Sequence, residues 1–422
     1  MKAFALYDKD NLGISDEQLF AAIEESLEGC GELKKVLLLP PDFTRFYSCA
    51  GKIINAYYNL LKDKCEIDVL PALGTHVPMT EEECKIMFPD IPFDKFIAHN
   101  WRTDVVKIGE VPASYVKEVS EGIMDESITV EVNKLIMDKS YDLILSVGQV
   151  VPHEVVGMAN YSKNVFVGCG GNRMINASHI LGAFYGMERM MGKDYTPVRK
   201  VFDYAQENFL KDVPLQYVLT VTTAPGNVPR IHGLFMGEGR KSFEKAVELA
   251  QEKNLIFVDK PFKKVVVNMD PSEFKTTWLA NKSVYRTRMA IADGGELIVL
   301  APGVHKFGED EAIDVLIRKY GYTGREHIIE CCKTCEDLKG NMSAAAHLIH
   351  GSSDGRFSIT YCTKLLSEEE VRGVGFEYIP YDEIVKTYDP EKLTDGYHTI
   401  NGEEIFYISN PALGLWADRS KF

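Results

Sequence analysis

The sequence predicts an α/β protein made of two domains, each with a largely parallel sheet. The chain has 422 residues, which is more than one ordinary hydrophobic core holds together. Short apolar runs alternate with helix-length segments, as they do where helices join the strands of a parallel sheet. Glycines and polar residues follow several of these runs, and open α/β sheets bind ligands beyond the carboxyl ends of their strands.

The first half of the chain contains four predicted strands, each ending in a turn. They are Lys35–Pro40, followed by Asp42-Phe43-Thr44-Arg45; Ile67–Leu73, followed by Gly74-Thr75-His76; Leu143–Val147, followed by Gly148 and later by His153; and Asn164–Val167, followed by Gly168-Cys169-Gly170-Gly171. Helices are predicted over Lys52–Leu61 and Met174–Tyr185.

A polar stretch at residues 251–254 precedes a second series of apolar runs, so we place the domain boundary near residue 258. The N-terminal domain then spans residues 1–257 and the C-terminal domain 258–398, and we expect residues 399–422 to return to the first domain. The predicted strands of the second domain are Lys264–Asn268, Glu296–Ala301, Phe357–Tyr361 and Phe376–Ile379, with a last strand-like run at Ile405–Ser409. Its predicted helices are Asp310–Tyr320 and Cys335–His350.

Composition excludes several classes of protein. Hydrophobic residues make up 45% and charged residues 26% of the chain, as in ordinary globular enzymes. The net charge of −15 repels phosphate backbones, so we expect no nucleic-acid partner. No run of about 18 apolar residues is present, and the first ten residues turn charged before a signal-peptide core forms, so we expect neither a membrane span nor a secretory signal.

The nine cysteines are irregularly spaced, which indicates reduced thiols and favours the cytoplasm. Cys331, Cys332 and Cys335 include one C-x-x-C pair, which is weak evidence for zinc without a second half. Thiols of a helix and its turn are the favoured interpretation, and the sequence leaves the role of this cluster open.

Four of the ten histidines have a distinctive context. His76 follows a predicted strand, His153 lies in Val-Val-Pro-His-Glu, and His179 lies on a predicted helix, whereas His99, in Ala-His-Asn, is less distinctive. One histidine in a turn is usually structural. Several at successive strand ends favour a shared site, because a parallel sheet brings those ends together.

Four further features each allow two interpretations. Lys163 is either a solvated lysine at the mouth of a strand or an amine that holds a cofactor covalently. Arg45 either offers a planar fork to a carboxylate or pairs with Asp42 to shape a helix start, and Asp42 can accept hydrogen bonds from sugar hydroxyls. The Gly168–Gly171 loop either approaches a phosphate or is a plain turn, since no phosphate-binding pattern is complete.

Together these residues resemble the lactate racemase family, whose members carry a nickel-pincer nucleotide. The resemblance covers nearly the whole chain and is strongest at Asp42-Phe43-Thr44-Arg45, at Gly74-Thr75-His76, and in the block from His153 through Lys163 to His179. The intervals of ten and sixteen residues in that block look like those of the family. Lys282, twelve residues before Gly294-Gly295, also resembles a family position.

The resemblance implies how the cofactor is held. Lys163 binds the pyridinium bis-thiocarboxylate mononucleotide through a thioamide, and His179 coordinates its nickel as the metal ligand. Asp42 and Thr44 belong to the cofactor-binding set of the N-terminal domain, with Asp42 at the ribose. A nickel ion bound by soft sulfur and one imidazole suits a square-planar site. Cofactor-maturation enzymes are then implied partners.

The resemblance also implies an isomerase, a racemase or epimerase that inverts C2 of a 2-hydroxy acid by reversible hydride transfer through a 2-keto acid. Hydride transfer avoids the dianion that direct proton removal beside a carboxylate creates. His76 and His153 are the implied acid/base groups, one for each enantiomer. Arg45 and Lys282 are implied to position the small-molecule substrate in an active-site cleft between the two domains.

Three departures from the family pattern indicate a substrate other than lactate, such as a sugar acid or a larger hydroxy acid. Asn160-Tyr161-Ser162 precedes Lys163, where the family often has Gly-Gly-Arg. Trp278-Leu279 replaces a tyrosine–glutamine pair, and Met342 replaces an aromatic residue. The sequence does not predict the oligomeric state.

Two other functions explain part of the pattern. A zinc-type hydrolase or lyase uses His76, His153 and His179 and has no need of Lys163. A non-enzymatic carrier of the nickel nucleotide needs Lys163 and His179 and has no use for the other two histidines.

Overall fold

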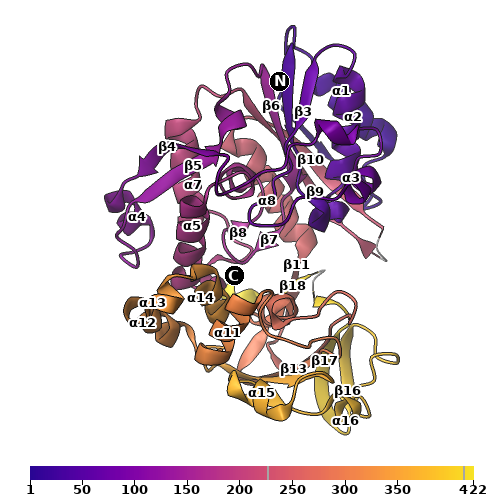
Figure 1. The fold of residues 1–422 in the computed structure, drawn as a ribbon. Coiled ribbons are helices and arrows are strands. Elements are labelled where there is room, and N and C mark those ends of the chain that lie inside the picture. The colour runs from indigo at the N-terminus through magenta and orange to yellow at the C-terminus, as the bar shows by residue number, and fades with distance from the viewer. Residues whose placement is uncertain (226–227, 412–413) are drawn as a thin grey trace. The chain divides into compact units, whose positions relative to one another are not determined.

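The structure, a computed structural model, describes residues 1–225, 228–411 and 414–422, and they form two compact units (Figure 1). Unit 1 comprises residues 1–181 and 190–254, and unit 2 comprises residues 182–189 and 255–422. Each unit contains its own six-stranded sheet. The predicted α/β class with two largely parallel sheets is therefore confirmed.

The sheet of unit 1 has a parallel half and an antiparallel half. Its order is β1 (Phe4–Tyr7), β10 (Arg230–Gly237), β9 (Leu215–Thr223), β6 (Leu143–Gln149), β2 (Lys35–Leu39) and β3 (Glu66–Val69). The pairs β9–β6, β6–β2 and β2–β3 are parallel, while β10 is antiparallel to both neighbours. Residues 36–39 of β2 are all buried, as expected for a strand covered on both faces.

Helices cover this sheet, and a hairpin extends from it. The helices of unit 1 are α1 (Asp16–Ser26), α2 (Ala50–Leu61), α3 (Glu81–Met87), α4 (Ala113–Val119), most of α5 (Asn172–Tyr185), α7 (Pro197–Phe209) and α8 (Arg240–Asn254), and the hairpin is β4 (Val105–Val111) with β5 (Ile128–Asn133). The short helix α6 (Met187–Met190) follows α5. The last turn of α5 and most of α6 belong to unit 2, where Glu188 pairs with Arg288 at 3.1 Å and with Arg356 at 2.6 Å.

Unit 2 is built on a second, more uniformly parallel sheet. Its order is β15 (Glu377–Tyr378), β14 (Phe357–Cys362), β13 (Ile291–Leu300), β12 (Phe262–Asn268), β17 (Glu403–Ile408) and β16 (Gly396–Ile400). Every pair is parallel except β16–β17. Its helices are α9 (Thr277–Ala280), α10 (Lys282–Thr287), α11 (Glu311–Tyr320), α12 (Arg325–Thr334), α13 (Glu336–Lys339), α14 (Met342–His350), α15 (Glu368–Gly373) and α16 (Tyr381–Ile384).

The C-terminal segment does not return to the first unit, contrary to our prediction for residues 399–422. Strand β17 pairs with β12, and β18 (Leu415–Asp418) pairs with β11 (Leu255–Val258), all within unit 2. Strand β12 would otherwise leave one edge unpaired, and β17 supplies the missing hydrogen bonds. The boundary itself lies between Asn254 and Leu255.

Two predicted elements differ in the structure. Residues Asn164–Gly168 form a π-helix, η4, instead of a strand. Strand β6 already has β2 and β9 as neighbours, so no free edge remains beside it for a further strand. The predicted helix Cys335–His350 is two helices, α13 and α14, separated at Gly340 and Asn341. The other predicted strands each overlap an observed strand.

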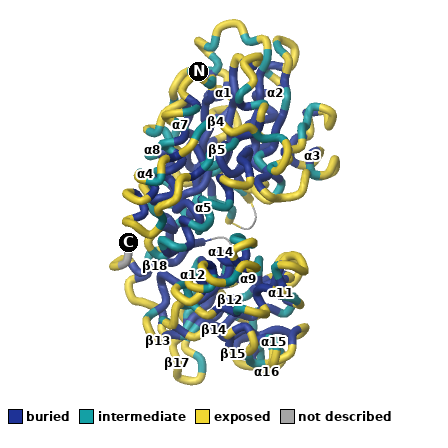
Figure 2. The backbone as a smooth tube through the Cα atoms, turned by 60° about the vertical axis from the view of Figure 1, so that its left-hand side comes forward, coloured by how far each residue is buried: buried dark blue, intermediate teal, exposed yellow. Residues whose placement is uncertain are grey.

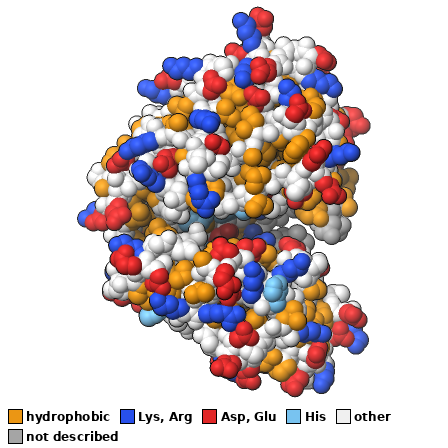
Figure 3. All heavy atoms as spheres, in the orientation of Figure 1, with side chains coloured by type: hydrophobic (Ala, Val, Ile, Leu, Met, Phe, Trp, Pro, Cys, Tyr) orange, Lys and Arg blue, Asp and Glu red, His pale blue; other side chains and the backbone are white. Residues whose placement is uncertain are grey.

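Burial follows the layers of each unit: sheet residues are mostly buried and the outer faces of the helices are exposed (Figure 2). Side chains of both signs are interspersed over the visible face in Figure 3. Among the described residues, no helix combines the length and the apolar character that a bilayer crossing requires.

Candidate active site

The turn after β2 places Asp42 and Thr44. Asp42 caps the 3₁₀ helix η1 (Phe43–Ser48), because its Oδ1 accepts from the Thr44 N–H at 3.1 Å and from Thr44 Oγ1 at 2.5 Å. From the other side, Thr220 and Thr222 of β9 donate their hydroxyls to the carbonyls of Ser48 and Tyr47. The start and the end of η1 are thus held by side-chain hydrogen bonds.

His76 meets Asp42 across the ends of two adjacent parallel strands. Its Nδ1 lies 2.5 Å from Asp42 Oδ2, while more than half of its side chain, 58%, stays exposed. In the neutral ring the Asp42 carboxylate accepts the Nδ1 proton, so the exposed Nε2 carries the lone pair. This pairing gives His76 the orientation and tautomer of a general base.

Asp42 is ionised in this arrangement. Burial raises the pKa of its carboxyl, but the hydrogen bond and charge of His76, with smaller effects from Thr44 and Arg45, bring that pKa below its ordinary value. Both carboxylate oxygens have protein partners, Thr44 on one and His76 on the other. Arg45 is exposed, and the described residues show no ion pair between it and Asp42, so the alternative of an Asp42–Arg45 pair is not formed.

His153 lies in the short hairpin of β7 (Pro152–His153) and β8 (Gly157–Met158), and it is buried, with 7% exposed. Its Nδ1 accepts the Val155 N–H at 3.1 Å and lies 3.9 Å from Glu154 Oε2. In the neutral ring the proton therefore sits on Nε2. Burial lowers the pKa of His153 well below its ordinary value; Glu154 opposes this shift, and Lys163, Arg45 and His179 add to it.

Lys163 stands at the start of η4, after two non-glycine residues with left-handed backbone, Asn160 (φ 64°) and Tyr161 (φ 55°). In the described parts of the chain no residue forms a hydrogen bond or ion pair with its Nζ. Burial, followed by the charge of Arg45, lowers the pKa of Lys163 to about 8, although Glu154 opposes the shift. More of this amine is neutral and nucleophilic near neutral pH than in an ordinary lysine, which fits covalent attachment better than a solvated strand cap.

Segment η4 connects the lysine to the His76 turn and to the central strands. Asn164, next to Lys163, donates to Leu39 O at 3.3 Å, at the end of β2, and to Ser146 Oγ at 2.9 Å, in the middle of β6. The Gly74 N–H donates to Gly168 O at 2.8 Å. A π-helical turn is a frequent feature of functional sites, and here it carries the lysine beyond the ends of two parallel strands.

His179 lies on α5, and its Nδ1 donates to Ile175 O at 2.7 Å. That bond fixes the tautomer and leaves the Nε2 lone pair, for which the described residues offer no partner. Burial lowers the pKa of His179, and the charge of Lys163 adds to this, against the bond to Ile175. A neutral imidazole oriented through its other nitrogen is the usual form of a histidine metal ligand, so His179 fits the predicted nickel ligand.

Unit 1 thus brings together seven of the predicted residues. Hydrogen bonds join Asp42 to Thr44 and to His76. Lys163 and His179 both act electrostatically on His153, and Arg45 acts on Lys163 and His153, so these groups share one neighbourhood. The predicted cluster that follows the strands comprises Asp42, Thr44, Arg45, His76, His153, Lys163 and His179.

Lys282 belongs to unit 2, at the start of α10, where its Nζ lies 5.5 Å from the centre of the Phe274 ring. Trp278, also in unit 2, packs against the buried His347 in a tilted arrangement, with 4.5 Å between ring centres. The predicted role of Lys282 in substrate binding, and the cleft between the domains, remain predictions.

Two sequence features have structural roles only. His99 donates from Nε2 to Gly170 O at 3.0 Å and accepts at Nδ1 from Asn133 at 2.9 Å, so it braces the glycine loop. That loop is a plain turn. Its N–H groups bond to carbonyls of the chain, and the Glu131 carboxylate accepts the Arg173 N–H at 3.3 Å, at the α5 N-terminus where a phosphate would lie.

The zinc alternative lacks its ligand set. The described residues contain no group of three or more His, Cys, Asp or Glu side chains placed to share a metal ion. The Nδ1 atom of His76 is already hydrogen-bonded to Asp42. In the cysteine cluster, Cys331 lies 3.5 Å from His327 Nε2, again without a complete set.

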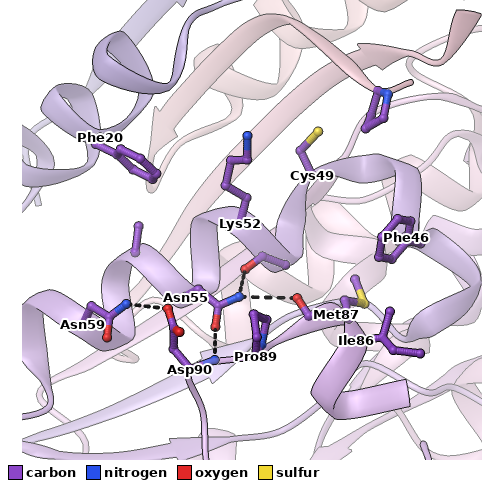
Figure 4. Close-up of a pocket in the computed structure, with 13 residues that line it drawn as sticks. Phe20, Phe46, Cys49, Lys52, Asn55, Asn59, Ile86, Met87, Pro89 and Asp90 are labelled. Atoms are coloured by element: carbon purple, nitrogen blue, oxygen red, sulfur yellow. Dashed lines mark hydrogen bonds between the residues drawn. The ribbon is translucent and has the colours of Figure 1, made fainter. Parts of the chain in front are cut away.

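A pocket of about 400 Å³ lies against the far end of η1 and the first turns of α2 (Figure 4). Its lining is mainly apolar and includes Phe20, Phe46 and Ile86. Its polar residue Asn55 is already bonded to Gly51 O and to Met87 O. It contains none of the predicted site residues, so it is separate from the histidine and lysine cluster.

The fold and the cluster define a class: an α/β protein with a histidine-surrounded lysine beyond the ends of parallel strands. Residues 20–191 match the lactate racemase N-terminal domain, and this match includes every predicted site residue of unit 1. Residues 20–191 are thus similar to the N-terminal domain of the lactate racemase family.

Two solved structures share the fold. A protein from Thermotoga maritima is 24% identical, with a TM-score of 0.77 over 97% of this chain and 99% of that one. The lactate racemase apoprotein from Thermoanaerobacterium thermosaccharolyticum is 18% identical, with a TM-score of 0.71 over 97% of this chain and 96% of that one. No curated protein shows a significant match.

Proposed function

We propose that this protein is an isomerase, a racemase or epimerase that inverts C2 of a 2-hydroxy acid with a nickel-pincer nucleotide attached to Lys163. One observation carries the proposal. Three reactive nitrogens, Nζ of Lys163 and Nε2 of His153 and His179, share one electrostatic neighbourhood, and no described residue bonds to any of them. Polar groups that lie close together without protein partners, His153 buried and Lys163 and His179 half-buried, are prepared for a ligand.

The residues fit the cofactor. The Lys163 amine, with its pKa lowered to about 8, is prepared to form the thioamide, and the fixed tautomer of His179 offers one imidazole nitrogen to nickel. Asp42 and Thr44 retain lone pairs for the ribose beside their mutual hydrogen bond. When bound, the nucleotide supplies the carbon that takes up and returns hydride.

The side chains of the chain manage the proton and the substrate. His76, oriented by Asp42, accepts the hydroxyl proton of the substrate at Nε2. His153 presents its Nε2 proton to the oxygen that becomes a carbonyl in the 2-keto acid. Arg45, exposed on η1 beside this group, offers a two-pronged guanidinium to the substrate carboxylate.

Lactate is not the proposed substrate, because Trp278 and Met342 replace the residues that the family has at those positions. A sugar acid or a larger hydroxy acid is the proposed class. A carrier function has no use for the Asp42–His76 pair, which orients a base.

Attachment is tested by the intact mass of protein produced together with the cofactor-maturation enzymes. We expect a mass gain that disappears in Lys163→Ala and persists in Lys211→Ala, a control at an exposed lysine. A gain that survives in Lys163→Ala, or none in the unaltered protein, contradicts the proposal.

Activity is tested by incubating the loaded enzyme with enantiopure 2-hydroxy acids and separating the products by chiral chromatography. We expect C2 inversion with most C2 deuterium retained, because hydride transfer does not exchange with water. Rapid loss of deuterium to solvent points to direct proton removal instead.

A further inference from the structure

A buried arginine lies beneath the segment that leads into Lys163. Arg199, on the first turn of α7, is fully buried, and its guanidinium donates to Met158 O at 2.7 Å, to Asn160 O at 3.2 Å and to Ser162 Oγ at 2.6 Å. Backbone carbonyls in a buried loop need such partners. One side chain therefore serves three acceptors within the five residues before the lysine.

The backbone of residues 158–162 includes a strained conformation that other side chains must stabilise. Asn160 and Tyr161 are consecutive non-glycine residues with positive φ, and for a bulky side chain this conformation is an outlier. Such residues persist only where the surroundings hold them. Tyr161 is fixed by its ring, which stacks on Phe243 with 4.9 Å between centres, and by Gln206, which donates to its hydroxyl at 2.6 Å. Arg199 binds the backbone carbonyls of Met158 and Asn160 in the same segment.

The charge of Arg199 is balanced within the same region. Asp203, one turn further along α7, is 2.5 Å from Arg240 Nη1 and accepts weakly from Ser162 Oγ at 3.4 Å. Burial raises the pKa of Asp203 to about 6, against the charges of Arg199 and Arg240. The Arg199 charge also contributes to the lowered pKa of Lys163. Arg199 is thus linked to the lysine by hydrogen bonds through the turn and by charge.

We propose that Arg199 is a positioning residue for Lys163: by binding Met158, Asn160 and Ser162 it holds the turn that presents the lysine amine. The effect of Arg199 on cofactor attachment rests on the proposed function. Its effect on the reactivity of the Lys163 amine does not. Two substitutions test the hydrogen bonds to this turn. Arg199→Lys keeps the positive charge and loses the planar guanidinium, and Ser162→Ala removes one acceptor of that guanidinium. Arg240→Met is the matched control, because Arg240 makes no described bond to residues 158–162.

The first measurement uses the protein without cofactor. Each protein is labelled with trace acetic anhydride between pH 6 and 10, and peptide mass spectrometry gives the labelling of Lys163 relative to the exposed Lys211. We expect Arg199→Lys to change this ratio at pH 8 at least threefold, and Ser162→Ala to change it less and in the same direction. Arg240→Met leaves it within 1.5-fold.

The second measurement is the rate of cofactor loading, followed as mass gain in the presence of the maturation enzymes. We expect Arg199→Lys to slow loading by about 10- to 100-fold, the usual effect of losing an orienting partner. Adding Asn160→Gly is expected to restore part of the loss, because glycine adopts positive φ without strain.

A purely structural role for Arg199 has a different outcome: the variants melt earlier, while folded protein keeps the original labelling ratio and loading rate. That result, in either Arg199→Lys or Ser162→Ala, overturns the proposal. If the unaltered protein never gains mass, the proposed function fails, and the labelling ratio still decides the role of Arg199.

Discussion

His76 and His153 differ in every feature that sets the behaviour of an imidazole. His76 is mostly exposed and hydrogen-bonded through Nδ1 to the Asp42 carboxylate. His153 is buried, and its Nδ1 accepts a backbone N–H from Val155. The free Nε2 is therefore an acceptor on His76 and a donor on His153. Two histidines that the family resemblance assigns to one kind of role are held in opposite states.

The difference arises from the elements that carry them. His76 ends the turn after β3, so the neighbouring strand β2 brings a carboxylate to its ring. His153 lies in the two-stranded hairpin of β7 and β8. The chain turns there so that the Val155 N–H donates to Nδ1 of the His153 ring. Under the proposed function, His76 is the proton acceptor and His153 is a hydrogen-bond donor.

Substituting each histidine with glutamine gives the largest expected effect. A glutamine amide can donate a hydrogen bond from the position of Nε2 but cannot accept a proton. We therefore expect His76→Gln to lower kcat/KM by about 10²- to 10⁴-fold, and His153→Gln to lower it by roughly tenfold, the effect of a weakened hydrogen bond. Chiral chromatography with the loaded enzyme provides the rates. Equal losses in the two variants would show that His153 is also a base, and the contrast would fail.

Asp42→Asn tests whether Asp42 orients His76 as a base, and we expect it to lower kcat/KM less than His76→Gln does. The amide keeps the shape of the side chain but no longer accepts the His76 proton as an anion, so we expect a 10- to 100-fold lower kcat/KM, roughly the effect of losing an orienting partner. In a double-mutant cycle, Asp42→Asn should add little to His76→Gln, because both act through one imidazole. Full additivity of the two losses indicates that Asp42 acts elsewhere, for example only on the ribose.

Much of this site could be predicted from the sequence, because it depends on strand ends. Apolar runs identify β2, β3 and β6, and parallel pairing brings the residues after them together, which accounts for Asp42 and His76. Strand β9 was not predicted, since threonines interrupt its apolar run, and these threonines hold η1 in place.

The remaining features depend on tertiary contacts that a sequence pattern does not encode. The apolar run at Asn164–Val167 has the composition of a strand, but both edges of β6 are occupied and it coils into a π-helix. Arg199 has the appearance of an ordinary polar residue in an amphipathic helix, and only the fold buries it. At Asn160 and Tyr161, where the family often has glycine, the structure shows the positive φ that glycine adopts without strain.

The smallest expected effect is on stability and depends on pH. The folded protein holds His153 with a pKa well below its ordinary value, mainly through burial. At a pH between the pKa of His153 in the folded protein and its pKa in the unfolded chain, the unfolded chain binds a proton that the folded protein does not. The contribution of His153 to stability is therefore complete above the ordinary pKa, near 6.5, and falls as the pH drops below it, by about 1.4 kcal/mol for each pH unit.

His153→Gln removes this titration, so the loss of unfolding free energy between pH 7.5 and 5.5, measured by urea denaturation, should be smaller in the variant than in the unaltered protein. The other buried histidines titrate in both proteins, so their contributions cancel in the comparison. An equal loss in both proteins means that the folded state protonates His153 as readily as the unfolded chain does. The Val155 bond would then not hold the ring neutral, and His153 would be free to act as an acid or base like His76.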